Sequence, residues 1–369
     1  MSTHCLILGA GVIGASVADA LASRGVRVTV LDMRSPGRGA SYASAGILAP
    51  YTEAHEHTPL LDLGTRSLSL FDAFIAGLQA ESGRTVEYAR TGTLEIAVDD
   101  EDNARLRASS RWLGAHGVGH EWIEAAELAR FEPAVSPAAR GGLFIRPHGF
   151  VGVQSLIMAL VHRARARGAT FESPVEAAEV IPYGDRVEVR AGDRRYTADA
   201  AVIASGSWSR RVRVKGMGAL PIRPVRGQLL HLKWPASGRP ARVVWGPRCY
   251  TVPWSNGTLL VGATVEEAGF DESTTAGGVR DLTQAVTELL PGSKDALFLD
   301  ARAGLRPATP DGLPAIGPVR GAPRVTIATG HYRNGILLAP LTAEVVANYI
   351  VDGVSDPIFQ VTSPDRLAT

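Results

Sequence analysis

Residues 4–32 read HCLILGAGVIGASVADALASRGVRVTVLD and carry the clearest evidence for the fold of this chain. A short apolar run leads into three glycines spaced as GxGxxG, a helix-like segment follows, and a second apolar run ends on Asp32. The three glycines of the turn are Gly9, Gly11 and Gly14. Strand, glycine turn, helix, strand and acid in this order predict a dinucleotide-binding unit at the start of the chain.

Each glycine of the turn has a physical reason to be there. Gly9 permits the tight turn, Gly11 lets the backbone approach a pyrophosphate, and Gly14 lets the helix pack close to the strand. The free N–H groups at the helix start, around Val12 and Ile13, attract phosphate. A glycine-rich turn that binds no ligand is the alternative for the same residues.

Asp32, at the end of this unit, indicates whether the adenosine ribose of the bound nucleotide carries a 2′-phosphate. Asp32 accepts hydrogen bonds from ribose hydroxyls, and we expect Met33 and Arg34 to lie against the same part of the nucleotide. Arg34 alone would favour a 2′-phosphate, but the Asp32 carboxylate would repel one. The pair therefore favours an adenosine ribose without that phosphate.

Two later segments favour a flavin dinucleotide over a nicotinamide one. Residues 197–206, TADAAVIASG, resemble the second FAD signature of flavoproteins with two dinucleotide folds, in which the strand end at Ser205 and Gly206 lies near the cofactor. An ordinary buried strand is the alternative. Residues 39–46, GASYASAG, are small enough to bring amides and hydroxyls to a pyrophosphate or a flavin ring, or to form a surface turn.

Length and charge exclude several classes of protein. The 369 residues suggest two domains, and the formal net charge of +1 argues against a nucleic-acid binder or a polybasic membrane-surface protein. Cys5 and Cys249 cannot form a disulfide framework, which fits a reducing, cytoplasmic compartment. We expect neither a secretory signal nor a run long enough to span a membrane.

The triplet His55-Glu56-His57 contains residue types that bind metal ions, so we consider it as a metal site. Its two histidines, two positions apart, would lie on opposite sides of a helix, and no third ligand stands near them in the sequence. We therefore expect no metal, and a polar lid loop in this segment.

Four motifs together resemble the D-amino-acid oxidase family of flavoproteins, and within it the glycine oxidases of thiamine biosynthesis. The last two motifs are long and specific, and the resemblance runs from about residue 4 to about residue 350. The motifs are GASYASAGILAP at 39–50, IASGSWS at 203–209, AGLRPATPDGLPAIG at 303–317 and ATGHYRNGILLAP at 328–340.

The resemblance implies an α/β fold with two domains, a Rossmann-like FAD-binding domain and a substrate-binding domain with a mixed or antiparallel sheet. The FAD-binding domain is expected to be discontinuous, at 1–82, 145–220 and 303–369, with the substrate-binding domain at 83–144 and 221–302. The hydropathy patterns agree with this division. They predict strands at 92–98, 228–232 and 258–262 and helices at 100–116, 124–131, 152–168 and 342–350.

The resemblance also implies three residues that contact the substrate. Arg306 matches the family arginine that pairs bidentately with a substrate carboxylate, a geometry that a guanidinium provides and an ammonium does not. Tyr250 matches a tyrosine that donates to the same carboxylate, and Arg333 lines the site. Taken alone, Arg306 fits a structural arginine bonded to backbone carbonyls equally well, and a tyrosine in a strand is more often core or rim.

The turn at 330–336 is expected to present backbone N–H groups and a helix start to the flavin, where negative charge develops on reduction. Val175 matches a position whose backbone meets the adenine, Leu48 lies in a loop expected to face the substrate, and Trp208 is expected at the flavin wall or in the core. Neither cysteine matches the site of covalent flavin attachment in related sarcosine oxidases, so FAD is expected to be noncovalent. The predicted cofactor residues are Gly9, Gly11, Val12, Ile13, Gly14, Asp32, Met33, Arg34, Ala40, Ser41, Ser44, Ala45, Gly46, Leu48, Val175, Ser205, Gly206, Trp208, Gly330, His331, Tyr332, Arg333, Asn334, Gly335 and Ile336.

The activity that the resemblance implies is oxidative deamination of glycine, of other small amines or of D-amino acids (sarcosine, D-alanine, D-proline). A hydride would pass to flavin N5, and O2 would accept the electrons and give H2O2, with a role in thiamine thiazole synthesis. One alternative is a dehydrogenase that passes electrons to a quinone, and another is a flavoprotein without activity. Tyr250, Arg306 and Arg333 together argue against the latter. The expected partners are a small amino acid and O2, with no nucleic acid and no membrane insertion, and a dimer or tetramer is expected by analogy.

Overall fold

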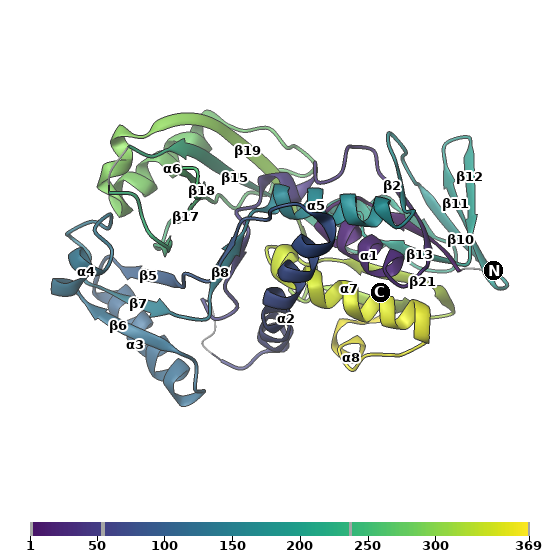
Figure 1. The fold of residues 1–369 in the computed structure, drawn as a ribbon, viewed down its shortest axis with the longest axis horizontal. Coiled ribbons are helices and arrows are strands. Elements are labelled where there is room, and N and C mark those ends of the chain that lie inside the picture. The colour runs from purple at the N-terminus through teal and green to yellow at the C-terminus, as the bar shows by residue number, and fades with distance from the viewer. Residues whose placement is uncertain (1–2, 53–55, 236–237, 368–369) are drawn as a thin grey trace.

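The computed structural model describes residues 3–52, 56–235 and 238–367. Two large β-sheets, one of six strands and one of eight, lie at opposite ends of an elongated molecule (Figure 1). The first sheet is mostly parallel and the second is mixed, which confirms the predicted α/β fold class.

The six-stranded sheet grows from the dinucleotide-binding unit. β1 (His4–Leu8) pairs in parallel with β2 (Arg27–Leu31) on one side and with β13 (Ala200–Ile203) on the other. Because parallel strands end at the same edge of a sheet, the turns after these three strands meet there. The remaining strands of the sheet are β9 (Thr170–Glu172), β20 (Ala315–Val319) and β21 (Ala322–Thr329).

Helices cover one face of this sheet and a small sheet covers the other. The helices α1 (Val12–Ala22), α5 (Val153–Ala166) and α7 (Gly335–Asp352) share one apolar cluster with β1 and β2, and α2 (Pro59–Ser82) joins the same cluster. A separate cluster on the opposite face joins the six-stranded sheet to a four-stranded one. The strands of that smaller sheet are β10 (Glu179–Tyr183), β11 (Arg186–Ala191), β12 (Arg194–Ala198) and β14 (Arg213–Val214).

The closing helix α7 departs from the sequence prediction at its start. It begins at Gly335 rather than at residue 342, because Pro340 lies inside the helix and does not end it. By length and apolar composition it is the one helix in the described ranges that could cross a membrane, with a mean hydropathy of 1.3 over 18 residues. However, 61% of it is buried in the protein, and it packs against α1 and α2 as a core helix.

The eight-stranded sheet holds the segments predicted to leave the dinucleotide fold. At one edge of this sheet, β19 (Leu297–Ala308) pairs with β15 (Arg223–Lys233), so the predicted domain boundary at 302/303 falls inside a strand. Beyond β15 follow β18 (Thr258–Gly262), β17 (Tyr250–Pro253), β16 (Val243–Trp245), β5 (Thr93–Ala97), β7 (Gly141–Ile145) and β6 (His120–Glu124).

The helices of this half agree with the predicted ranges to within a few residues. α3 (Asp100–Ala115) corresponds to the predicted helix at 100–116, and α4 (Ala125–Phe131) to the one at 124–131. In the other half, α5 corresponds to the predicted helix at 152–168. α6 (Ala276–Leu289) packs on the eight-stranded sheet as well. Strands β3 (Ile47–Leu48), β4 (Tyr88–Ala89) and β8 (Gly149–Val151) form a small sheet between the two large ones (Figure 1).

Candidate active site

A cavity of about 910 Å³ is lined by residues from both large sheets. One end is formed by the turns that follow β1, β2 and β13, and the other by β17, β18, β19 and the turn before α7. We refer to these as the nucleotide end and the amine end.

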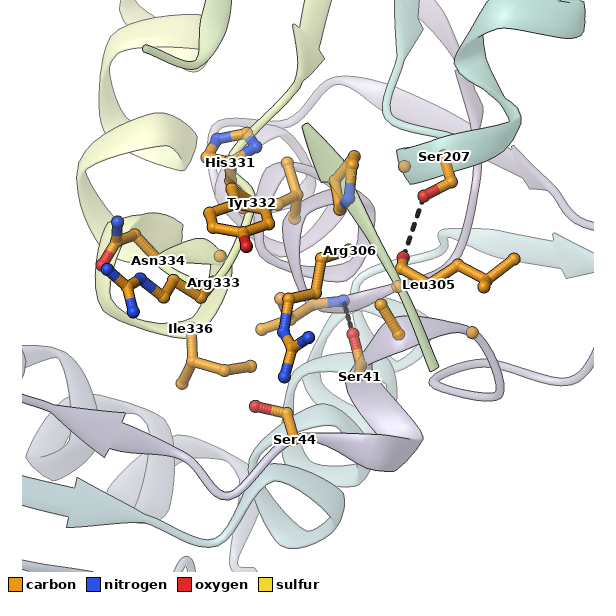
Figure 2. Close-up of a pocket in the computed structure, with 18 of the residues that line it drawn as sticks. Ser41, Ser44, Ser207, Leu305, Arg306, His331, Tyr332, Arg333, Asn334 and Ile336 are labelled. Atoms are coloured by element: carbon orange, nitrogen blue, oxygen red, sulfur yellow. Dashed lines mark hydrogen bonds between the residues drawn. The ribbon is translucent and has the colours of Figure 1, made fainter. Parts of the chain in front are cut away.

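The glycines of the β1–α1 turn are required by close backbone approaches at the nucleotide end. Gly9 has a φ of 109°, and a Cβ there would overlap the main chain of Ala204, which follows β13. A Cβ on Gly14 would collide with the carbonyl oxygen of Gly9. The first turn of α1 is completed from a distant segment, since Val12 N donates to Ser41 Oγ at 3.0 Å (Figure 2).

Asp32 is fixed by backbone donors and faces the cavity. Ala10 N donates to Asp32 Oδ2 at 2.6 Å, and Arg34 N donates to Oδ1 at 2.7 Å. Burial raises the pKa of the Asp32 carboxyl, and these two N–H bonds oppose that rise. A carboxylate oxygen accepts more than one hydrogen bond, so Asp32 retains acceptor sites for ribose hydroxyls.

Arg34 is paired with an acid from the distant loop before α6. Its guanidinium donates to Glu272 Oε1 at 3.1 Å and Oε2 at 2.6 Å, and it lies over the ring of Trp208 at 4.7 Å. This pairing neutralises the cation that a 2′-phosphate would need. Trp208 lines the cavity from the turn that follows β13, so it belongs to the nucleotide end, and its ring also contacts Phe270.

Most of the predicted residues lie in the wall of this one cavity. Those that line it include all three predicted substrate contacts, Tyr250, Arg306 and Arg333. The lining residues from the cofactor set are Gly9, Gly11, Val12, Ile13, Asp32, Met33, Arg34, Ala40, Ser41, Ser44, Ala45, Gly46, Val175, Ser205, Gly206, Trp208, His331, Tyr332, Arg333, Asn334, Gly335 and Ile336.

Three predicted residues do not line the cavity. Gly14 is used for helix packing, and Gly330, with a φ of 76°, lies against Thr309 behind the wall. Leu48 was expected to face the cavity, but its side chain is fully buried in the helical core. Alternation along the chain turns the neighbouring Ile47 and Ala49 to the cavity instead.

The amine end is built around Arg306 and Tyr250. Arg306 Nη1 donates to the carbonyl oxygens of Thr264 at 3.0 Å and Arg226 at 3.3 Å. Burial raises the pKa of the Tyr250 hydroxyl, and the nearby Arg306 guanidinium opposes that rise. No carboxylate within the described ranges forms an ion pair with Arg306. A guanidinium and a hydroxyl in this arrangement are groups that can donate hydrogen bonds to a carboxylate.

Two strand glycines make room for these side chains, and the sequence reasoning missed both. A Cβ on Gly227 of β15 would overlap the Arg306 guanidinium, and a Cβ on Gly262 of β18 would overlap the Tyr250 ring. A glycine inside a strand often marks a place where another group comes close to the main chain, so the sequence contained a signal for both positions. That signal identifies the approaching side chains only once the strand register is known, which places Gly227 beside Gly304 and Gly262 beside Tyr250.

The turn from His331 to Ile336 closes the amine end. Figure 2 shows Tyr332, Arg333 and Ile336 around the space that holds the Arg306 side chain. Tyr332 has a φ of 50°, and its N–H donates to Pro307 O at 2.9 Å, which ties the turn to the strand of Arg306. The N-terminus of α7 at Gly335 faces the cavity, so its positive dipole end does too.

His331 is a buried residue at the start of this turn. Its ring nitrogen Nε2 bonds Thr342 Oγ1 at 3.1 Å, and burial lowers the pKa of the imidazole to about 3.

Of the triplet expected to form a lid, His55 lies outside the described residues, and His57 pairs with Asp62 at 2.8 Å. The described part of the chain holds no cluster of residues fit for a metal ion.

A family model, a related sequence and a solved structure all point to the same protein family. A family model described as FAD dependent oxidoreductase (DAO) matches residues 4–349. Glycine oxidase of Geobacillus kaustophilus is 32% identical over 346 residues, covering 93% of this chain and 92% of that protein. The crystal structure of glycine oxidase from the same organism superposes with a TM-score of 0.93 at 31% identity, covering 98% of each chain.

A second kind of relative is longer than this chain. The bifunctional protein ThiO/ThiG of a Nostoc species is 32% identical over 365 residues, which is 97% of this chain. The chain spans about half the length of that protein, 54%.

Proposed function

This chain belongs to the DAO family of FAD-dependent oxidoreductases, and from that premise we propose that it oxidises glycine and related small amines. The proposed reaction converts glycine, O2 and water into glyoxylate, ammonia and H2O2. Sarcosine, D-alanine and D-proline are further candidate substrates. The observation that carries the proposal is the pair formed by Arg306 and Tyr250, a cation and a hydroxyl without a carboxylate partner in the described residues.

The residues of the nucleotide end fit FAD, the cofactor of this family. Gly9 and Gly11 leave the backbone uncovered where a pyrophosphate would approach, and Asp32 offers acceptors to an unphosphorylated ribose. The first N–H groups of α7 and the hydroxyl of Ser44 line the other part of the cavity. We propose that these groups hold the cofactor without a covalent bond.

The side chains of the amine end would bind and orient the substrate. Arg306 and Tyr250 would hold the carboxylate at two points, which fixes the direction of the Cα–H bond. When bound, FAD supplies the hydride acceptor for that bond. Arg333 would add positive potential near the carboxylate.

The lining residues favour a substrate amine that is already neutral when it reacts. The only carboxylates among the described lining residues are Asp32 and Glu176, Asp32 being part of the nucleotide end, and the His331 imidazole is bonded to Thr342. None of these lies with Arg306 and Tyr250. Direct transfer of hydride from a deprotonated amine requires no such base, and we propose that mechanism.

We further propose a role in making the thiazole of thiamine, in the cytoplasm. The support is the similarity to the bifunctional protein ThiO/ThiG over almost the whole of this chain. Deletion of the gene should produce a requirement for thiazole that the wild-type gene relieves. Growth of the deletion strain without thiazole would rule this role out.

Substrate and acceptor are tested together with the purified holoenzyme. Anaerobic glycine, sarcosine, D-alanine or D-proline should bleach the visible flavin absorbance, and admission of oxygen should restore it with formation of H2O2. Bleaching that oxygen does not reverse, and that a quinone does, would instead identify a dehydrogenase. An unchanged spectrum with every amine would reject the proposed function.

A further inference from the structure

A second cavity, of about 440 Å³, adjoins the amine end. It shares Thr52 and residues 245–247 with the main cavity, so the two meet at the turn after β16. We call it the Glu95 pocket, and its lining residues are Thr52, Glu95, Ile96, Asp102, Arg105, Trp245, Gly246 and Pro247.

The sheet register places Glu95 in line with the carboxylate site. Tyr250 of β17 pairs with Trp245 of β16, and Trp245 pairs with Glu95 of β5, so the three side chains share one face of the sheet. The rings of Tyr250 and Trp245 are 5.0 Å apart between centroids. Adjacent strands lie about 4.8 Å apart, so the backbones of Tyr250 and Glu95 are about 10 Å apart.

Glu95 is a buried acid without a hydrogen-bond partner in the described ranges. Its side chain is 5% exposed, and burial raises the pKa of its carboxyl to about 8, a rise that the charge of Arg105 partly opposes. Arg105 is paired with Asp102 at 2.8 Å, so these two charges balance one another. Once ionised, Glu95 therefore gives the pocket a net negative charge.

A second buried polar group in the pocket also lacks a partner. Thr52 is 7% exposed and lines both cavities, and its Oγ1 bonds to no residue in the part of the chain that the structure describes. Buried polar atoms are almost always hydrogen-bonded, and leaving one unpaired costs free energy. The Glu95 carboxyl lines the same pocket, so a ligand there would complete the hydrogen bonds of both groups.

We propose that the Glu95 pocket binds the cationic end of a basic amino-acid substrate whose carboxylate lies at Arg306. The substrate class is a D-amino acid with a terminal ammonium or guanidinium, whose extended side chain would span the space between the two sites. Glu95 would accept a charge-assisted hydrogen bond, and Trp245 would offer an aromatic face to the same cation. Thr52 would supply a further acceptor. This inference rests on the proposed function, because it extends the substrate range of the same site.

The kinetic test compares substrates of equal length. D-Lysine and D-norleucine differ chiefly in the terminal ammonium, and glycine reports the reaction without a side chain. The wild-type enzyme should show a kcat/KM for D-lysine about tenfold to a hundredfold above that for D-norleucine. Glu95→Gln should abolish this preference and leave glycine and D-norleucine within twofold of wild type. Glu121→Gln, an exposed glutamate on β6 of the same sheet, is the matched control and should change nothing.

A binding test works even without turnover. Hexanoate and 6-aminohexanoate lack the α-amine, so neither is oxidised, and each is titrated into the oxidised holoenzyme while the flavin spectrum is recorded. We expect 6-aminohexanoate to bind at least tenfold more tightly than hexanoate, and Glu95→Gln to remove the difference. Equal affinities in the wild type, or a preference that survives Glu95→Gln, would overturn the inference. Glycine turnover with either result would leave the proposed function intact.

Discussion

The two ends of the main cavity use different parts of the polypeptide. At the nucleotide end, the cavity is lined mainly by glycines, backbone N–H groups and the carboxylate of Asp32, mostly within residues 9–46. At the amine end, the cavity is lined by the side chains of Tyr250, Arg306 and Arg333, which come from separate strands and a turn.

This difference has a consequence for substitutions. Where the main chain forms the site, a new side chain acts by steric overlap, and cofactor affinity should change. Where side chains form the site, truncation removes a charge or a donor, and catalysis should change while the cofactor stays bound.

Arg306→Ala should have the largest effect. Loss of a buried charged partner costs about 2–5 kcal/mol, so kcat/KM for glycine should fall about 10²- to 10³-fold or more. The flavin content of the purified protein should match wild type. Arg306→Lys is the control that keeps the positive charge but lacks the two parallel N–H donors of the guanidinium, and it should recover only a minor part of the lost kcat/KM. A kcat/KM within threefold of wild type in Arg306→Ala would refute the carboxylate site.

Gly9→Ala should produce the opposite pattern at the nucleotide end. The φ of 109° and the overlap with Ala204 cost about 1–3 kcal/mol, so the Kd for FAD should rise about tenfold to a hundredfold. At saturating FAD, the KM for glycine should be unchanged. Gly77→Ala in α2, where a Cβ meets no atom within 4 Å, is the matched control. A normal FAD affinity in Gly9→Ala would show that the β1–α1 turn tolerates a side chain.

Gly227→Ala tests whether main-chain space also matters at the amine end. The new Cβ would displace the Arg306 guanidinium, so kcat/KM for glycine should fall about tenfold, as expected for a displaced charged hydrogen bond. FAD binding should remain normal. The combination with Arg306→Ala should be no worse than Arg306→Ala alone, because both act through one side chain. Additive losses would indicate a separate effect of Gly227 on the sheet.

Glu95→Gln should have the smallest effect, on stability and with a defined pH dependence. The folded-state pKa of Glu95 is raised to about 8, so its contribution to stability is present at low pH and is lost as the pH rises through 8. Asp102 and Arg105 are the charged groups that line the same pocket. The Tm of Glu95→Gln should therefore exceed that of wild type by more at pH 9 than at pH 5. A Tm difference independent of pH would show that Glu95 is not held in a costly environment.

The nucleotide end could be predicted because its determinants are close together in the sequence. Gly9, Gly14 and Asp32 belong to one strand–helix–strand unit, so spacing alone placed them. Arg306 and Tyr250 were predicted through family motifs, and their location in one cavity agrees with those motifs.

The remaining features depended on long-range register. Trp245, Gly227 and Glu95 reach the amine end or its neighbouring pocket only because of how β15, β16 and β5 pair, and no local pattern gives those pairings. Leu48 was misplaced for a related reason, since which side of a two-residue strand faces the cavity depends on its partner β8. The hydropathy pattern predicted the closing helix only from residue 342, whereas α7 begins at Gly335, inside the turn where a helix start was expected, and contains Pro340. Its packing in one apolar cluster with α1 and α2 stabilises the helix around this proline.

We propose that Arg306 and Tyr250 orient a small amino acid for oxidation in a cavity that holds FAD. The most direct test of this proposal is anaerobic mixing of the holoenzyme with glycine while the visible flavin absorbance is followed. We predict a saturable bleaching in the wild type, and in Arg306→Ala a bleaching slowed by at least a hundredfold at low glycine, with FAD still bound. Equal rates in the two proteins, or no bleaching of the wild type, would contradict the claim.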